Sequence, residues 1–152
     1  MPSGGQVQGE FAGRISDAGG YANDGIAVIR YLIDANCAIY AMSGDFEGMR
    51  TKMMACEPGE IAFSVISYAE VAHGTYVGKP PSPEVLAAFV EAIPLVPFDE
   101  AAALEYARLP FKRARFDRLL AAHGRSLGAV VITNNEADFA DVPGLKVENW
   151  TV

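Results

Sequence analysis

The hydrophobic positions of this chain alternate between short apolar runs and longer segments with helical spacing. Four short runs, IAVIRYLID, EIAFSVI, PLVPF and AVVIT, are followed near the end of the sequence by a fifth, LKVENW. Short runs rich in β-branched residues are typical of strands that are buried on both faces of a parallel sheet. The pattern therefore predicts strands over 26–34, 60–66, 94–98, 129–133 and 145–150.

The segments between these strands have the spacing and the end signals of helices. Ser82 followed by Pro83 predicts one helix start, and Asp99 predicts another. Helices are expected over 36–42, 44–59, 67–78, 82–93, 99–109 and 116–128, with a turn or short helix over 134–144. Strands that alternate with helices favour parallel pairing and right-handed crossovers. We expect an α/β fold, a three-layer α/β/α domain around a mainly parallel sheet.

The composition of the chain indicates a single globular domain. Its 152 residues are 51% hydrophobic and 20% charged, which suffices for one core and leaves little room for a second. The first 25 residues are rich in Gly, Ser, Ala and Gln and predict a flexible leader, 1–25. The domain is expected to span 26–152.

Charge and cysteine content narrow the function classes. A net charge of −7 argues against nucleic-acid binding through a broad basic face, so any such contact must be local. The two cysteines, Cys37 and Cys56, form neither a CxxC pair nor a disulfide framework. No apolar run reaches the roughly 18 residues of a membrane span, and no signal peptide is evident. We expect a cytoplasmic protein whose cysteines are reduced and which neither spans nor binds a membrane.

Acidic and amide side chains follow the predicted strands at one edge of the sheet. Asp34 follows the first strand, Glu70 lies in the first predicted turn of the helix after the second, and Asp117 starts the helix before AVVIT. Asn135 and Asp138 follow AVVIT. The carboxyl ends of parallel strands form the crevice where ligands bind in open α/β sheets. These residues are therefore candidates for one site.

Two interpretations of these acids stay open. Taken singly, they can be helix caps: Ser67 to Glu70 fits a capping box, Asn135 to Asp138 resembles one, and Asp117 suits a helix dipole. Taken together, they form a self-repelling cluster that needs a counter-ion, and hard oxygen ligands favour Mg²⁺ or Mn²⁺. Such a site suits phosphodiester hydrolysis, with a metal that activates water.

The segments YLIDANCAIYAM, FSVISYAEVAHG, FDRLLAAHGRSLGAVVITNN and DFADVPGLKVENW resemble the ordered motifs of the PIN-domain ribonucleases, specifically the VapC toxins of bacterial toxin–antitoxin pairs. The resemblance runs from about Val28 to Trp150. It implies a metal-dependent endoribonuclease whose partners are an RNA substrate, a VapB-like antitoxin and a second copy of the chain in a homodimer.

The resemblance also assigns roles to individual residues. It implies that Asp34, Glu70 and Asp117 bind the metal, and that Asn135 or Asp138 takes the place of the family's fourth acid. Two further residues resemble supporting polar positions of the family, namely Asn36 and Thr133.

The chain departs from the family pattern at three places. Ala35 stands where a hydroxyl residue is common, Asn135 is neutral, and the segment before Asp117 is about ten residues shorter than in relatives. We expect this segment to form the flap over the site. The departures keep open an alternative function, that of a catalytically impaired PIN-fold protein that acts through antitoxin binding and transcriptional regulation.

The shortened segment carries a basic cluster, which we expect to bind RNA phosphates. Its members are Lys112, Arg113, Arg115 and Arg118. A solvated surface run is the plainer interpretation, and single-stranded or loop RNA is the expected target if the cluster binds RNA.

A third interpretation makes Asp34 the nucleophile of a phosphoaspartyl enzyme. Such an enzyme needs a second acid two positions later or a lysine after a later strand. Position 36 is Asn and AVVITNN contains no lysine, which argues against it.

Overall fold

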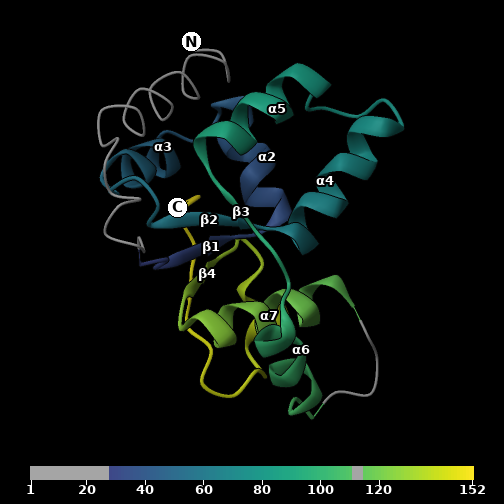
Figure 1. Cartoon of the computed structure of the whole chain (residues 1–152). Coiled ribbons are helices and arrows are strands. Elements are labelled where there is room, and N and C mark those ends of the chain that lie inside the picture. Colours follow the sequence, from purple (N-terminus) through teal and green to yellow (C-terminus); the bar gives the residue numbers. More distant parts are fainter. Residues whose placement is uncertain (1–27, 111–114) are drawn as a thin grey trace.

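A computed structural model describes residues 28–110 and 115–152 of the chain (Figure 1). The predicted leader, 1–25, lies outside the described residues, as do Lys112 and Arg113 of the basic cluster. Five strands form one sheet in the order β3-β2-β1-β4-β5, and every neighbouring pair is parallel. The predicted parallel α/β architecture is therefore confirmed.

The elements follow one another in the order that the hydrophobic pattern predicts; the five strands are shorter than predicted, whereas α2 is slightly longer and α4 is shifted toward the N-terminus. In chain order they are β1 (Tyr31–Ile33), α2 (Ala35–Ser43), α3 (Glu47–Met54), β2 (Ile61–Ser64), α4 (Val65–Tyr76), α5 (Pro83–Ala92), β3 (Leu95–Val96), α6 (Glu100–Ala107), α7 (Phe116–Leu127), β4 (Val130–Ile132), the 3-10 helix η2 (Glu136–Phe139) and β5 (Val147–Glu148).

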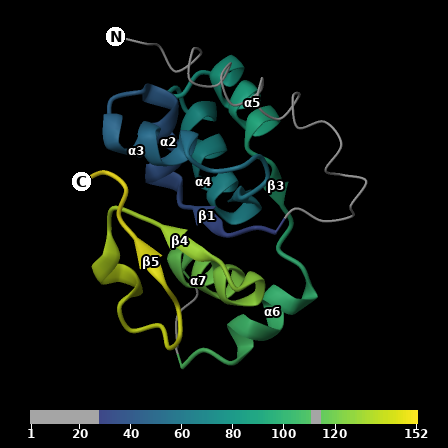
Figure 2. The ribbon, with the colours of Figure 1, turned by 90° about the vertical axis from the view of Figure 1, so that its left-hand side faces the viewer.

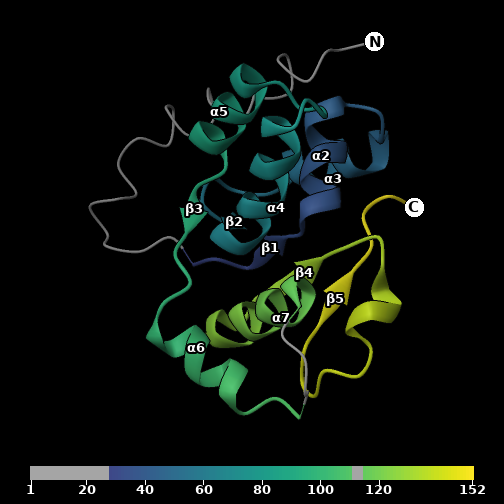
Figure 3. The same cartoon turned by 90° about the vertical axis from the view of Figure 1, so that its right-hand side faces the viewer.

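The sheet separates two hydrophobic cores, which makes the fold three-layered (Figures 2 and 3). Side chains alternate between the faces of a strand, so Ile33 of β1 points into one core and Leu32 into the other. Helices α2 to α5 cover the Ile33 face, and α6 and α7 cover the Leu32 face. Burial on both faces explains why the strands are continuous apolar runs.

The start of α4 differs from the prediction. The sequence places the helix start at Ser67, but α4 begins at Val65 and its cap is Ser64, whose hydroxyl accepts a hydrogen bond from the Ile66 N–H at 3.0 Å. Ser67 is buried inside the helix. The predicted capping box from Ser67 to Glu70 is therefore wrong, and Glu70 lies in the second turn of α4.

Helix α7 lies close to β4 because of a glycine. A Cβ at Gly124 would come within 2.9 Å of Cγ2 of Val131 and 3.3 Å of Cδ1 of Leu145. The absence of a side chain thus sets the distance between the helix that carries Asp117 and the sheet. Within the described residues, no helix is both long and apolar enough to span a membrane.

Candidate functional site

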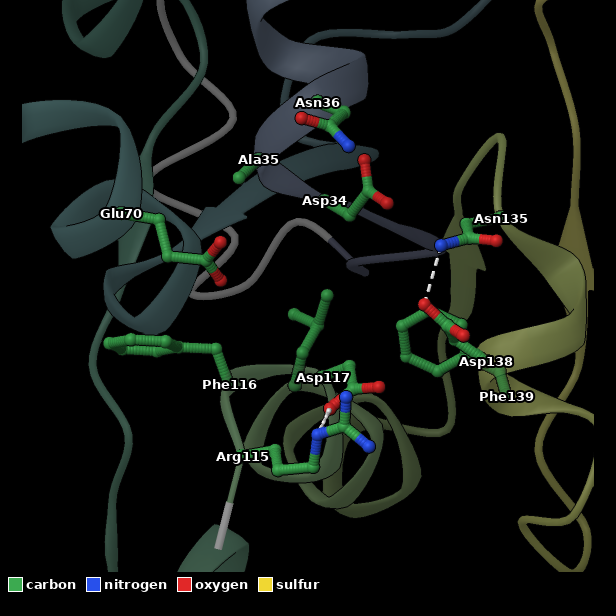
Figure 4. A pocket seen from close by; sticks show the side chains of 11 residues that line it. Asp34, Ala35, Asn36, Glu70, Arg115, Phe116, Asp117, Asn135, Asp138 and Phe139 are labelled. Carbon is green, nitrogen blue, oxygen red and sulfur yellow. Dashed lines mark hydrogen bonds and ion pairs between the residues drawn. The ribbon is translucent and has the colours of Figure 1, made fainter. Parts of the chain in front are cut away.

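The site lies at the point of the sheet where the segments that follow neighbouring strands switch from one face to the other. Strand β1 pairs with β2 on one side and β4 on the other. Helices α2 and α4, which follow β1 and β2, pack on the Ile33 face, whereas η2, which follows β4, packs on the Leu32 face. At the carboxyl ends of these strands lies a cavity of about 440 Å³ (Figure 4). Its lining comprises Asp34, Ala35, Asn36, Glu70, Arg115, Phe116, Asp117, Leu120, Asn135, Asp138 and Phe139.

Asp34 is buried at the junction between β1 and α2, with 8% of its surface exposed. Its backbone N–H donates to the carbonyl of Ile132 at 3.0 Å, and its Oδ1 accepts from the Cys37 N–H at 2.8 Å. Burial raises the pKa of Asp34, while hydrogen bonding from Thr133 and Cys37 opposes that rise. The residue therefore both caps α2 and places a carboxylate at the cavity wall.

Glu70 reaches the same cavity from α4 (Figure 4). Its pKa is raised, first by loss of solvent and then by the negative charges of Asp34 and Asp117. Two neighbouring carboxylates thus disfavour the ionised form of Glu70. A cation in the cavity would relieve this repulsion.

Asp117 approaches from the first turn of α7, on the side of the cavity opposite to Asp34 (Figure 4). Its Oδ1 lies 4.0 Å from Nε of Arg115, whose side chain is 64% exposed. The structure thus brings together the three predicted carboxylates, from three elements that are far apart in the sequence. Asp117 also occupies the helix-start position that the dipole argument gave it.

Asn135 and Asp138 form the remaining polar wall of the cavity. The side-chain amide of Asn135 donates to Oδ2 of Asp138, and the backbone N–H of Asn135 donates to the Thr133 hydroxyl at 3.0 Å. Asn135 makes no side-chain cap for η2, so its predicted capping role is wrong. Thr133 connects this wall to Asp34, because it also hydrogen-bonds that carboxylate. Asn36, the other predicted supporting residue, lies at the cavity rim above Asp34.

The two described arginines of the basic cluster have different surroundings. Arg115 lines the cavity, whereas Arg118 points to the loop after η2. There Nη1 of Arg118 donates to Oδ1 of Asp141 at 2.7 Å and Nη2 donates to Oδ2 at 3.2 Å. This pairing lowers the pKa of Asp141.

The donor set of the cavity fits a hard divalent cation. Among residues 28–110 and 115–152, no three His, Cys, Asp or Glu side chains converge closely enough to hold one ion in the positions they take here. Mg²⁺, however, is usually bound by one or two carboxylates and keeps several waters. Asp34, Glu70 and Asp117 line one space, and any two of these three carboxylates would meet that requirement. Since none of the described residues that line the cavity is a lysine, the phosphoaspartyl interpretation receives no support.

The sequence interpretation missed the apolar part of the lining. Leu120 and Phe139 are buried lining residues, and Phe116 is an exposed one. Leu120 was predictable, because it is one helical turn from Asp117 and shares its face. No local signal distinguishes Phe116 from a core aromatic.

Comparison with known proteins gives one family and a consistent set of relatives. A family model described as PIN domain matches residues 31–145. The tRNA(fMet)-specific endonuclease VapC of Shigella flexneri is 26% identical over 133 residues, which cover 82% of this chain and 100% of that protein.

Solved structures show the same fold. VapBC2 from Rickettsia felis bound to a DNA fragment from its promoter matches with a TM-score of 0.70 and 23% identity, over 80% of this chain and 99% of that chain. DNA-bound VapBC from Salmonella typhimurium matches with a TM-score of 0.66 and 26% identity, over 80% of this chain and 98% of that chain.

Proposed function

The chain belongs to the PIN domain family, as its motifs predicted, and from this premise we propose that it is a Mg²⁺- or Mn²⁺-dependent endoribonuclease, the toxin of a type II toxin–antitoxin pair. One observation carries the proposal. Asp34, Glu70 and Asp117 come from three separate elements, line one cavity and interact through their charges. Caps alone give no reason for such a gathering.

In this proposal the three carboxylates hold the cation. When bound, Mg²⁺ or Mn²⁺ supplies the positive charge that activates a water for attack on a phosphodiester. Asp34 is the best-fixed ligand, because the Cys37 N–H holds its Oδ1 and the side chain of Thr133 also acts on the carboxylate. Burial of Asp34 also makes its charge more effective, since surrounding solvent screens it less.

The polar wall positions the substrate in our proposal. Asn135 holds Asp138 by a side-chain hydrogen bond, so the two act as one unit that orients the water or the phosphate. Arg115 reaches the cavity and would neutralise an RNA phosphate. Arg118 is proposed as a weaker RNA contact, because its guanidinium is already held by Asp141. Lys112 and Arg113 complete the proposed cluster.

The proposed partners follow from the relatives. The solved neighbours from Rickettsia felis and Salmonella typhimurium are VapBC complexes on DNA, and we propose a VapB-like antitoxin for this chain too. A homodimer and a cytoplasmic location belong to the same proposal.

A second candidate function is an impaired PIN-fold protein that acts only through its antitoxin. Two features of the cavity favour it. Ala35 lines the wall without a hydroxyl, and Asn135 contributes no charge. The first removes a hydroxyl that could hold a metal-bound water, and the second removes a negative charge that would attract a second ion.

Calorimetric titration with Mn²⁺ and an RNA-cleavage assay on the same samples separate the two candidates. We compare the wild type, Asp34→Asn and the control Asp45→Asn, which changes an exposed aspartate outside the cavity. A working nuclease binds Mn²⁺ and cuts RNA in the wild type and the control, and loses both in Asp34→Asn. Metal binding without cleavage in the wild type supports the impaired protein. Absence of both contradicts the metal site itself.

A further inference from the structure

Phe116 is an exposed aromatic side chain at the rim of the carboxylate cavity. It is the first residue of α7, 51% of its surface is exposed, and it lines the cavity. The other apolar lining residues, Ala35, Leu120 and Phe139, are buried. The exposed ring of Phe116 is therefore the apolar surface of the lining that a ligand entering the cavity can reach.

The ring lies on one particular side of the cavity. Figure 4 shows Phe116 beside Glu70, whereas Asn135 and Asp138 lie on the opposite side. The three carboxylates thus lie between an apolar wall and a polar wall. A ligand that crosses the cavity meets an aromatic face on one side of the acids and hydrogen-bonding groups on the other.

The neighbours of Phe116 favour a nucleotide over a protein segment. Glu70 lies on one side of the ring, and the next residues along the chain, Arg115 and Asp117, bring further charges to the same rim of the cavity. A protein helix that docks on apolar residues needs a contiguous apolar patch, which these charges interrupt. An aromatic ring next to an arginine is instead the pairing with which proteins hold single strands, since the base stacks while the cation meets the phosphate.

We propose that Phe116 is a stacking site for one base of a single-stranded RNA, the base on the Glu70 side of the phosphate that lies over the carboxylates. The inference rests on the proposed function, because the strand runs through the same cavity. A volume of about 440 Å³ is in the range of small-ligand sites, which suits one nucleotide inside the cavity. Stacking is sequence-tolerant, so Phe116 selects for an unpaired strand rather than for one base.

The test measures RNA binding apart from cleavage. The full chain carries Asp34→Asn to block cutting, and the probe is a fluorescein-labelled single-stranded RNA of about ten nucleotides. A second probe is an abasic strand of the same length, which keeps the phosphates and lacks every base. The variants are Phe116→Ala, Phe116→Leu and Phe116→Trp, and Tyr76→Ala is the control because Tyr76 is exposed but lies outside the cavity.

Stacking predicts that Phe116→Ala weakens binding of the RNA about tenfold and leaves binding of the abasic strand unchanged. Phe116→Leu behaves like Phe116→Ala, since it keeps the apolar volume without the ring face. Phe116→Trp retains affinity, and its new indole fluorescence is quenched by RNA; the single native tryptophan, Trp150, is 3% exposed and supplies a constant background. Tyr76→Ala changes nothing.

Equal weakening for both probes, or none for either, overturns the proposal, and so does a loss of antitoxin binding in Phe116→Ala with RNA binding intact. The result is independent of the nuclease assay. If wild-type protein does not cut RNA but the difference between the two probes persists, the stacking site stands and the proposed nuclease falls. If RNA is cut and Phe116→Ala binds both probes normally, the proposed nuclease stands and the stacking site falls.

Discussion

The hydroxyl of Ser64 lies 2.8 Å from Nδ1 of His123 and joins the end of β2 to the middle of α7. Ser64 also caps α4, which carries Glu70, while α7 carries Asp117. The pair therefore connects two of the elements that bring carboxylates to the cavity. His123 is buried, and its Nε2 has no hydrogen-bond partner among the described residues.

Burial lowers the pKa of His123, although the charge of Asp99 and the carbonyl of Pro97 oppose this shift. The folded pKa therefore lies below the unfolded value of about 6.5. The unfolded chain binds the proton first, so the stability that neutral His123 contributes is complete above about pH 6.5 and is lost as the pH falls through the folded pKa. We expect His123→Gln to show a shallower loss of unfolding free energy below about pH 6.5 than the wild type.

Urea denaturation at a series of pH values measures this slope. His73→Gln is the matched control, because His73 is the other histidine of the chain and is exposed on α4. Equal slopes for the wild type and His123→Gln would show that the buried ring does not titrate in this way.

Two substitutions at Asp34 are expected to differ in stability. Because burial raises its folded pKa, protonated Asp34 stabilises the fold, and this contribution is lost as the pH rises through that value. Asp34→Asn removes the cost of the buried charge and still caps α2, since Asn is as good a cap as Asp. Asp34→Ala removes both the buried charge and the side-chain cap of α2. We expect the unfolding free energy at pH 7 in EDTA to be at least that of the wild type for Asp34→Asn, and about 1 kcal/mol lower for Asp34→Ala than for Asp34→Asn.

The difference between Asp34→Asn and the wild type should shrink toward pH 3, where the wild-type carboxylate is protonated. Equal stability of Asp34→Asn and Asp34→Ala would mean that the hydrogen bond to Cys37 contributes nothing.

Substitutions of Arg115 and Arg118 are expected to change the salt dependence of RNA binding by different amounts. Arg115→Ala removes one phosphate contact, which weakens RNA binding and lowers the slope of log K against log salt by about 0.7 for a single strand. Arg118→Ala chiefly breaks the pair with Asp141, so its larger effect is on thermal stability. Anisotropy titrations between low and moderate salt measure the slopes. A larger slope change for Arg118→Ala than for Arg115→Ala would reverse this assignment.

Two helical glycines are expected to respond in opposite directions to alanine. Gly124→Ala places a Cβ 2.9 Å from Val131 and should destabilise the protein by about 1–3 kcal/mol. Among the described residues, a Cβ at Gly74, in α4, meets only Cβ of Lys79, at 3.9 Å, so Gly74→Ala should stabilise the protein by about 0.4–1 kcal/mol. Thermal and urea unfolding measure both changes, and a stabilised Gly124→Ala would contradict the close packing of α7 on β4.

The parts of the site that the sequence predicts are those that depend on strand ends. Asp34 directly follows a buried run, and the parallel sheet brings it to the same edge as Asn135 whatever the length of the intervening chain. The start of α4 was misplaced because Ser64 and Ser67 are equally good caps locally, and the strand pairing of Ser64 with Val96 decides between them.

Long-range side-chain pairs had no sequence signal. Arg118 and Asp141 are 23 residues apart, and their pairing depends on how the loop after η2 folds back on α7. The contact between Ser64 and His123 spans 59 residues and likewise depends on packing between layers. Predicting either from the sequence would require the tertiary structure first.

The central place of β1 also determines when the cavity can assemble during synthesis of the chain. Strand β1 pairs with β2, which is synthesised soon afterwards, and with β4, which leaves the ribosome about a hundred residues later. A chain interrupted before β4 has Asp34 and Glu70 but lacks Asn135 and the strand whose Ile132 carbonyl receives the N–H of Asp34. Translation products that end before β4 therefore cannot assemble the cavity.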